Sequence, residues 1–458
     1  MILVVAEKPS VAQTIGKVLG ATSRKDGYLE GEAYLVSWCV GHLVGLADAS
    51  VYDQRYAKWR YDDLPIIPEE WLYEVPKDKM QQFKVLSALM KDKRVTELVC
   101  ATDAGREGEL IFRLVYQKAG CRKPFKRLWI SSLEDSAIRD GFQHLRDSSE
   151  FDRLYEAALS RSKADWIVGI NGTRLFSTLY HKKLVVGRVQ TPTLAMLVER
   201  DGKITTFRKE KYFNVHIQKD SLKASLEKLK TEEEAKRIAE ACDKKQASVS
   251  SLKKERKTVN PPKLYDLTTL QREANRYFSF TAQQTLDLVQ SLYEKKLLTY
   301  PRTDSQFITD DMEGTVRQVI SILCRKLPLF DGVAYTPDID RISNNAKVTD
   351  HHAILPTVQV EKLDIAELPE SEQKILRLVA TRLICATGEK HIYDETTMTV
   401  SCEGSLFTAK GKTVVQDGWK GIELRFKATL KSKEKEELET VLPEVTEGDI
   451  CLLYTSDA

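Results

Sequence analysis

Carboxylate side chains stand at two places in this chain where a predicted strand ends. Glu7 follows the apolar run 2–6, and Asp103 ends a second buried-strand pattern, with Glu107 and Glu109 opening the helix after it. Parallel α/β sheets place their ligands at the edge where the strands end, and two or three carboxylates there suit a hard cation such as Mg²⁺. Taken alone, Glu107 and Glu109 also fit the acids that stabilise the first turn of many helices.

A tyrosine in a turn-like stretch is the second chemical signal. In LTYPRTDS, Tyr300 precedes Pro301 and is followed by Arg302. A free phenol has a pKa of ~10, so only about one in a thousand is ionised at pH 7. A nearby guanidinium favours the phenolate and stabilises a pentavalent phosphorane. Tyr300 is therefore a candidate nucleophile on a phosphodiester, although for this stretch alone a packed turn tyrosine is the simpler explanation, since the chain has 17 tyrosines.

A third set of residues has side chains suited to a strand of nucleic acid. In GRVQTP, Gly187 lets a backbone come close, Arg188 offers a phosphate contact and Gln190 offers a hydrogen bond. Upstream, Arg161 and Asp165 share one face of a predicted helix. For that pair alone, an ordinary helical ion pair is the simpler explanation.

A fourth stretch, DHHAILPT, holds the adjacent His351 and His352, which suit donation to a phosphate or to a leaving oxygen. No third ligand follows at zinc spacing and the eight cysteines form no CxxC pair, so neither a zinc site nor a disulfide framework is expected. The sequence GKT at 411–413 has Leu406 where a phosphate-binding loop requires glycine. Hydrolysis of ATP through such a loop is therefore not expected.

The elements that would position these residues begin with an α/β pattern. Residues 1–150 alternate β-branched runs with helical periods, which predicts a largely parallel sheet. A helix is predicted from Ser10 to about Gly20, and Ser131 and Glu134 have the spacing of a capping box. The carboxylates of this part are thus expected on strand ends and helix starts.

The rest of the chain changes pattern twice. Residues 151–205 and 264–390 are mostly helical by periodicity, whereas 212–218 and 396–415 have strand patterns. A helical block between β-rich pieces indicates that one β domain is built from two separated segments. No internal repeat is present.

Composition adds little about partners. The 70 Lys and Arg residues against 67 Asp and Glu give a net charge of +3, although residues 161–211 carry +7 and 434–449 are acidic, which points weakly toward a polyanion. No apolar run approaches the ~18–20 residues of a membrane span. The start MILVVAEKPS lacks the basic region and cleavage site of a signal peptide. A cytoplasmic location is therefore expected.

Taken together, the four stretches resemble the type IA DNA topoisomerases, and most closely the bacterial topoisomerase III branch. AEKPS and TDAGREGE resemble the two halves of that family's Toprim metal site. GRVQTP, LTYPRTDS and DHHAILPT resemble its strand-binding and tyrosine motifs, in the family's order. The resemblance runs from Met1 to about residue 448.

The resemblance implies a role for each matching residue. Tyr300 would be the nucleophile, Glu7 the proton-transfer group, Lys8 and Arg302 the phosphate stabilisers, and His351 an auxiliary residue. Glu7, Asp103 and Glu107 would hold Mg²⁺, and the groove for a single strand would be lined by Arg161, Asp165, Gly187, Arg188 and Gln190. The implied enzyme is an ATP-independent DNA topoisomerase that relaxes negatively supercoiled DNA or decatenates DNA through a 5′-phosphotyrosine intermediate. A monomer acting on DNA with single-stranded character is expected.

The family's fold implies a multidomain, toroidal architecture. The expected division is a Toprim domain (1–150), a helical strand-binding segment (151–207), a split β-rich domain (208–262 and 394–458) and a helical domain carrying the tyrosine (263–393).

Two departures from the family pattern affect these expectations. Gly105 stands where the family usually has an aspartate, which would weaken Mg²⁺ binding unless Glu109 compensates. The chain also stops at Ala458, earlier than family members do. These departures lead to the hypothesis of a truncated chain with an incomplete ring, in which strand cleavage survives better than strand passage. Two alternatives stay open, namely a Toprim nuclease that uses the metal site alone and a catalytically impaired fragment that binds single-stranded DNA.

Overall fold

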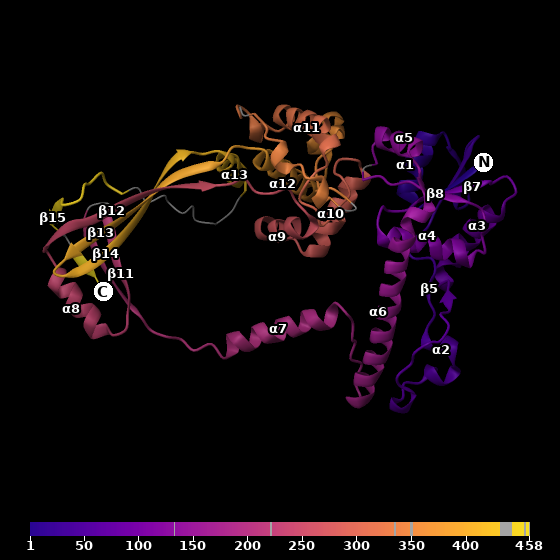
Figure 1. The fold of residues 1–458 in the computed structure, drawn as a ribbon, viewed down its shortest axis with the longest axis horizontal. Helices are drawn as coiled ribbons and strands as arrows, with labels where there is room; N and C mark the ends of the chain where they lie inside the picture. The colour runs from indigo at the N-terminus through magenta and orange to yellow at the C-terminus, as the bar shows by residue number, and fades with distance from the viewer. Residues whose placement is uncertain are drawn as a thin grey trace. The chain divides into compact units, whose positions relative to one another are not determined.

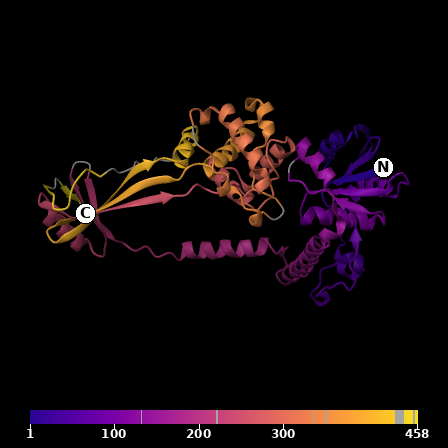
Figure 2. The ribbon, with the colours of Figure 1, turned by 45° about the horizontal axis from the view of Figure 1, so that its top comes forward.

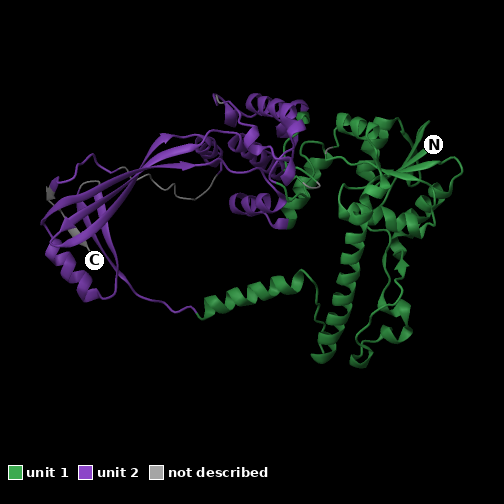
Figure 3. Cartoon of the chain, viewed as in Figure 1, with its two compact units in different colours: residues 1–206, 283–305, 348–359 green, residues 207–282, 306–347, 360–458 purple. Residues whose placement is uncertain are grey.

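The computed structural model describes residues 1–131, 133–219, 222–333, 336–348, 351–430, 442–452 and 455–457. The chain forms two compact units (Figure 3). Unit 1 consists of Met1–Thr206, Gln283–Ser305 and Val348–Gln359, and unit 2 consists of Phe207–Ala282, Gln306–Lys347 and Val360–Ala458. Two short pieces of the helical block, which carry Tyr300 and His351, thus belong to the same unit as the N-terminal α/β region. The domain boundaries expected from the sequence remain a prediction.

Unit 1 contains a seven-stranded sheet (Figure 1). Its strands are β1 (Ile2–Ala6), β2 (Ser23–Lys25), β3 (Tyr28–Glu30), β4 (Tyr34–Trp38), β7 (Glu97–Ala101), β8 (Phe125–Arg127) and β9 (Arg146–Asp147). The order is β2-β3-β4-β1-β7-β8-β9. The four central strands β4, β1, β7 and β8 run parallel, as the alternating pattern predicts. A separate pair joins β5 (Gly45–Leu46) to β6 (Tyr73–Glu74).

The register of the central strands sets the position of the first carboxylates. Ala6, the last residue of β1, is level with Ala101, the last residue of β7. Glu7 and Asp103 therefore leave the sheet at the same edge. Such an edge is where parallel sheets bind ligands.

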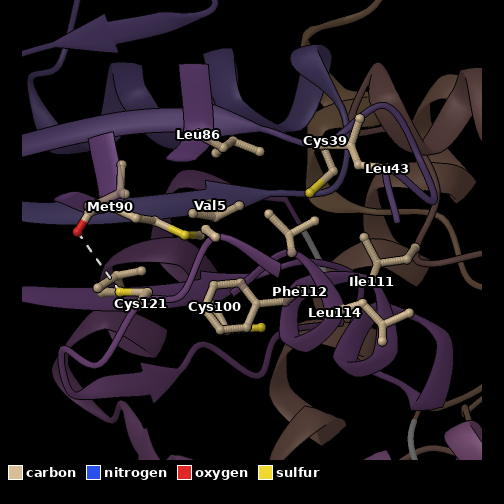
Figure 4. Packing of buried hydrophobic residues seen from close by; sticks show 14 of the residues in the cluster. Val5, Cys39, Leu43, Leu86, Met90, Cys100, Ile111, Phe112, Leu114 and Cys121 are labelled. Atoms are coloured by element: carbon tan, nitrogen blue, oxygen red, sulfur yellow. Dashed lines mark hydrogen bonds between the residues drawn. The ribbon is translucent and has the colours of Figure 1, made fainter. Parts of the chain in front are cut away.

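Alternating side chains of β1 divide the core of unit 1 into two layers. Leu3 and Val5 lie in one buried cluster, and Val4 and Ala6 lie in the other. Figure 4 shows the first cluster, where many of the buried side chains come from the sheet and from helices α3 (Met80–Lys91) and α4 (Arg106–Lys118), and others, such as Cys39 and Cys121, come from loops. The second cluster includes helix α1 (Pro9–Leu19) and helix α5 (Asp135–Gln143).

The helical block contributes directly to this second cluster. Tyr293 and Tyr300 are both buried in it, beside residues of β1 and α1. Tyr293 lies on helix α10 (Ala282–Glu294), and Tyr300 follows in the turn after that helix. Apolar packing against the sheet is therefore what carries the candidate nucleophile to the strand ends.

Three more helices complete unit 1. They are the short α2 (Ala49–Tyr52), the 28-residue α6 (Asp152–Leu179) and α7 (Gln190–Thr205). Asn171 of α6 is hydrogen bonded to both the N–H and the carbonyl of Ile66, which fixes α6 to the segment before β6. Every residue of α7 is exposed.

Unit 2 contains an antiparallel sheet in the order β15-β12-β13-β14-β11-β10-β16. Its strands are β10 (Phe213–Lys219), β11 (Leu222–Leu229), β12 (Gln246–Val259), β13 (His391–Cys402), β14 (Ser405–Gln416), β15 (Ile450–Leu452) and β16 (Thr455–Asp457). The long strands β12 and β13 pair along almost their whole length, with β14 beside β13 (Figure 2). Because the helical block lies between β12 and β13 in the sequence, this sheet joins two separated segments.

The helices of unit 2 are α8 (Glu232–Cys242), which packs on the sheet, and α9 (Leu267–Phe278), α11 (Glu313–Lys326), α12 (Glu370–Ala386) and α13 (Trp419–Ala428). Arg382 of α12 pairs with Glu273 of α9 and lies 4.2 Å over the ring of Tyr265, so a partly buried ion pair ties α9 to α12. No helix in the described parts of either unit is long and apolar enough to cross a membrane.

One local prediction is wrong. The spacing of Ser131 and Glu134 favours a capping box, but helix α5 begins at Asp135 and its N-cap residue, Glu134, makes no side-chain cap. Glu134 is hydrogen bonded instead to Thr357 and to the backbone of Val358. Tertiary partners have thus displaced the local cap, because side chains that favour caps bond equally well to other backbone groups.

Candidate active site

The carboxylates of Glu7 and Asp103 meet at the edge of the sheet. The backbone N–H of Asp103 donates to Oε2 of Glu7 across 3.3 Å, and Glu7 is only 7% exposed. Burial, followed by the charge of Asp103, raises the pKa of Glu7 to about 7. A carboxyl group with such a pKa is suited to accepting and returning a proton near neutral pH.

Tyr300 reaches this pair although it lies 197 positions after Asp103 in the chain. Its hydroxyl donates to Oδ2 of Asp103 across 2.9 Å, and the residue is 7% exposed. Its turn is held by the neighbouring segment, since the N–H of Thr299 donates to the carbonyl of Leu355 across 2.9 Å. The structure therefore brings together the predicted nucleophile and two predicted acids.

The electrostatics of Tyr300 differ from the sequence-based argument. Burial raises the pKa of its phenol well above the usual range, and the charges of Asp103 and Glu7 raise it further, while Arg302 acts in the opposite direction. Arg302 therefore favours the phenolate, as expected, but burial and the charges of the two acids outweigh it. The phenol is a neutral donor, and its activation needs a base. Asp103 is already in contact as the acceptor.

His351 completes a group that we call the nucleophile pocket, defined as Glu7, Asp103, Tyr300 and His351, in which Asp103 is partly exposed and the other three residues are buried. The ring centroid of His351 lies 4.2 Å from that of Tyr300, and its Nδ1 lies 3.2 Å from Oγ of Ser131. Burial, and then the charge of His352, lowers the pKa of His351 to about 4. The imidazole is therefore neutral at pH 7. The adjacent Thr349 and Asp350 lie outside the described residues.

The two predicted phosphate stabilisers lie around this pocket. Nζ of Lys8 is 3.8 Å from Glu294, and about a third of its side chain is exposed. Arg302 is exposed. Both positive charges lower the pKa of Glu7, which shows that they act on the same site. Their exposure leaves them able to contact a phosphate.

Glu107 has a different environment from the one expected of a metal ligand. Its Oε1 lies 3.2 Å from Arg161 and its Oε2 lies 3.4 Å from Nε2 of His42. The contact with His42 and the charge of Arg161 lower the pKa of its carboxyl group. Its proposed role as a ligand stays a prediction, and it requires Glu107 to leave these two partners.

The donors present suit a magnesium ion held by two carboxylates. Within the described part of the chain, no three His, Cys, Asp or Glu side chains converge as a metal cluster. Mg²⁺ is commonly bound through one or two carboxylates, with water and substrate phosphates as the other ligands. Glu7 and Asp103 share one edge, and the raised pKa of Glu7 reflects in part the charge of Asp103. The residues therefore fit such an ion.

Glu109 is not available to compensate for Gly105. It is fully buried, with Oε2 3.1 Å from Nε of Arg127 and Oε1 2.7 Å from Nε of Arg113. Arg127 is also buried and donates to the carbonyls of Cys100 and Thr102, across 2.9 and 2.7 Å. This ion-pair network holds the end of β7 and with it the loop that carries Asp103.

Gly108 was missed by the sequence reasoning. A Cβ added at Gly108 would lie 2.0 Å from the carbonyl oxygen of Asp103, whereas one added at Gly105 would meet nothing within 4 Å. The first turn of α4 therefore approaches the Asp103 loop so closely that only glycine fits. The sequence did contain a signal for this close approach, namely a glycine in the first turn of a predicted helix, where glycine is otherwise unfavourable.

The predicted strand-binding residues form an exposed row of charges. Nε of Arg188 lies 2.6 Å from Oδ1 of Asp165, and Nε of Arg161 lies 4.0 Å from the other oxygen of Asp165. Since Arg161 also contacts Glu107, these four side chains alternate in sign, and we call them the charged line. The line is defined as Glu107, Arg161, Asp165 and Arg188.

The two remaining predicted strand-binding residues follow Arg188 in the chain. The N–H of Gly187 donates to Oγ1 of Thr191 across 3.1 Å, and Gln190 is the first residue of α7. Gln190 is exposed, and Gly187 is partly exposed. They are therefore accessible next to the charged line, although no contact in the structure assigns them a ligand.

Comparison with known proteins decides the family. Residues 149–457 match the family described as DNA topoisomerase, and residues 2–133 match the Toprim domain. The chain belongs to the type IA DNA topoisomerase family. Within it, the chain is topoisomerase III-like: it is 41% identical to DNA topoisomerase 3 of Bacillus licheniformis over 98% of its length, and 40% identical to that of Bacillus subtilis over 99%.

These relatives are longer than the chain. It spans 62% of the Bacillus licheniformis topoisomerase and 63% of the Bacillus subtilis one. Among solved structures, full-length topoisomerase I from Thermotoga maritima superimposes with a TM-score of 0.73, covering 99% of this chain and 71% of that one, at 23% identity. At this identity the likeness concerns the fold, which is that of a Toprim domain joined to a type IA topoisomerase core.

Proposed function

We propose that this chain cuts and reseals one strand of DNA, with Tyr300 as the nucleophile. The observation that carries the proposal is the 2.9 Å hydrogen bond from the Tyr300 hydroxyl to Asp103, beside a buried Glu7 whose pKa is raised to about 7. A buried, neutral phenol in contact with an acidic pair has a proton acceptor at the atom that must become nucleophilic. A buried tyrosine packed only for stability also needs a hydrogen-bond acceptor, but it does not need an acidic pair that can take up its proton.

In the proposed cleavage step, a bond forms between the Tyr300 oxygen and the scissile phosphorus. The bond from that phosphorus to the 3′ oxygen breaks. The Asp103–Glu7 pair accepts the phenol proton, and Glu7 returns a proton to the leaving 3′ oxygen, which becomes a hydroxyl group. Resealing is the reverse reaction. The phosphotyrosine bond conserves the free energy of the broken phosphodiester bond, so no ATP is needed. Arg302 and Lys8 would contact the non-bridging phosphate oxygens.

Magnesium bound by Glu7 and Asp103 would neutralise phosphate charge and hold the DNA in place. Glu107 would join as a ligand only on leaving Arg161 and His42. Arg161, Asp165, Gly187, Arg188 and Gln190 would bind the strand. The favoured substrate would be DNA with single-stranded character, such as negatively supercoiled or catenated duplexes. The proposed protein acts as a monomer in the cytoplasm.

The test is a search for DNA joined to Tyr300. The chain is incubated with a single-stranded oligonucleotide labelled at its 3′ end, denatured and separated by electrophoresis. A labelled protein band is expected, because the fragment that keeps the 3′ label is the one joined through its 5′ phosphate. Tyr300→Phe should lose the band, whereas Tyr180→Phe, at a 67% exposed position, should keep it. Cleavage that persists in Tyr300→Phe would indicate a Toprim nuclease, and binding without any adduct would indicate an idle fragment.

A further inference from the structure

One short segment of the Toprim region touches both separated pieces of chain that carry the nucleophile pocket. The N–H of Tyr300 donates to the backbone carbonyl of Ser131 across 3.3 Å, and the hydroxyl of Ser131 lies 3.2 Å from Nδ1 of His351. We propose that Ser131 is a positioning residue for strand cleavage, which holds the Tyr300 backbone through its carbonyl and orients the His351 ring through its hydroxyl. This inference rests on the proposed function.

The residues after Ser131 fix the same two pieces of chain. Asp135 forms an ion pair with Lys296 across 2.6 Å, close before Tyr300. Glu134 is hydrogen bonded to the Thr357 hydroxyl and to the backbone of Val358, close after His351. The segment therefore contacts each piece at more than one point, and its own position is set independently of the hydroxyl contact. The Ser131 hydroxyl is thus placed to orient the His351 ring, whose segment is already held nearby by these other contacts.

The hydroxyl contact determines which ring nitrogen faces the reaction. His351 is 5% exposed, and its Nε2 is buried with no hydrogen-bond partner among the described residues. The backbone of Ala104, next to Asp103, raises the pKa of His351 as a hydrogen-bond acceptor beside the ring does, so the ring lies next to the Asp103 loop. With Nδ1 occupied by Ser131, Nε2 is the nitrogen left for a phosphate or a leaving oxygen.

A neutral imidazole has only one N–H, so whether Ser131 donates to Nδ1 or accepts from it decides whether Nε2 carries the ring hydrogen. If the Ser131 hydroxyl donates to Nδ1, the ring hydrogen must reside on Nε2, where it can be donated. A phosphodiester is an anion and its leaving oxygen gains a proton, so a donor is the form of Nε2 that cleavage requires. We therefore assign Ser131 as the donor to Nδ1, by the same logic that fixes tautomers at metal-bound histidines.

The test compares Ser131→Ala with Ser131→Thr in the full 458-residue chain. The alanine variant removes the hydroxyl and keeps the backbone carbonyl, and threonine restores a hydroxyl. The first readout is ¹⁵N–¹H spectroscopy of the His351 ring in protein without DNA or metal. We expect one tautomer with hydrogen on Nε2 in the unaltered chain, a shift or averaging of both ring nitrogens in Ser131→Ala, and recovery in Ser131→Thr.

The second readout is the rate of adduct formation with the labelled oligonucleotide. Ser131→Ala should slow it about tenfold, in the range of lost positioning contacts, while DNA affinity stays within about twofold and Ser131→Thr recovers most of the rate. Ser136→Ala serves as the control, because Ser136 is exposed on the first turn of α5.

Several outcomes would overturn the proposal. They are unchanged His351 resonances in Ser131→Ala, no recovery in a folded Ser131→Thr variant, or an unaltered adduct rate despite shifted resonances. If the unaltered chain forms no adduct at all, the proposed function fails instead. The ring spectra still decide whether Ser131 sets the tautomer.

Discussion

The nucleophile pocket and the charged line belong to the same compact unit, but they differ in their exposure to solvent. Glu7, Tyr300 and His351 are between 5% and 7% exposed, whereas the side chains of Arg161 and Arg188 in the charged line are 39% and 50% exposed. Burial shifts the pKa of each of those three pocket residues strongly. In the charged line, the contact with His42 and the charge of Arg161 lower the pKa of Glu107, and the hydrogen bond from Arg188 lowers the pKa of Asp165.

This difference indicates a division of labour. Low solvent exposure strengthens the electrostatic interactions among the pocket residues. The loss of a single hydrogen-bonding atom there therefore has a large effect on proton transfer. Exposed charges are screened by salt and reorganise at little cost, which suits reversible contact with a strand. Each substitution below tests one side of this comparison.

The largest effect is expected from the acids of the pocket. Glu7→Gln and Asp103→Asn keep the shape of the side chain and remove the proton acceptor. Adduct formation should slow by about 10²–10⁴-fold, the contribution of a general base, with DNA affinity unchanged or higher because a negative charge is lost. Single-turnover adduct assays with fluorescence anisotropy measure the two quantities. Glu97→Gln, at the start of β7, is the control, and a wild-type rate in either pocket variant would contradict the assignment.

The next effect concerns the loop that supports the pocket. Gly108→Ala forces a Cβ to within 2.0 Å of the Asp103 carbonyl, whereas Gly105→Ala meets nothing within 4 Å. We expect Gly108→Ala to lower the free energy of unfolding by about 1–3 kcal/mol, as overpacking does. Gly105→Ala should lower it by less than about 1 kcal/mol, the range of a changed N-cap. Urea denaturation followed by circular dichroism compares them, and equal values would show that α4 does not approach the loop as described.

A smaller effect is expected in the charged line. Arg188→Gln should weaken binding of a single-stranded oligonucleotide about three- to tenfold at low salt. The slope of log affinity against log salt should become shallower by about 0.7, the value for one phosphate contact on a single strand. Arg325→Gln is a matched control, since Arg325 is also an exposed, ion-paired arginine but belongs to unit 2. An unchanged slope would remove Arg188 from the strand-binding set.

The smallest effect is expected for stability in the same line. Asp165→Asn removes the exposed partner of Arg188 and should change the free energy of unfolding by less than about 0.5 kcal/mol, as for most surface ion pairs. Urea denaturation measures it. A decrease in the free energy of unfolding of more than about 2 kcal/mol would mean that the charged line stabilises the fold. The contrast between exposed, weakly coupled charges and the largely buried nucleophile pocket would then disappear.

Parts of the site follow from the sequence because local rules determine them. Parallel strands that end level must bring Glu7 and Asp103 to one edge, and helix geometry must place Arg161 near Asp165. The approach of Tyr300 to Asp103 depends on packing between segments 197 positions apart, which no local pattern encodes. Only the family resemblance predicted it.

The remaining differences have the same origin. Arg188 is closer to Asp165 than Arg161 is, because a loop can bring its side chain to a helix at any angle. Ser131 bonds to His351 in place of a local cap, since tertiary partners compete with the backbone for the same hydroxyl. The partners of Glu107 could not be read from its position in the first turn of a helix.

The central claim is that the Tyr300 phenol becomes covalently joined to DNA. The most direct measurement is proteolysis of the denatured adduct, followed by mass spectrometry of the peptide that carries the nucleotide. A phosphonucleotide on Tyr300, absent in Tyr300→Phe, is the predicted result. An intact, DNA-bound chain that yields no modified peptide, or a nucleotide on another residue, would contradict the account.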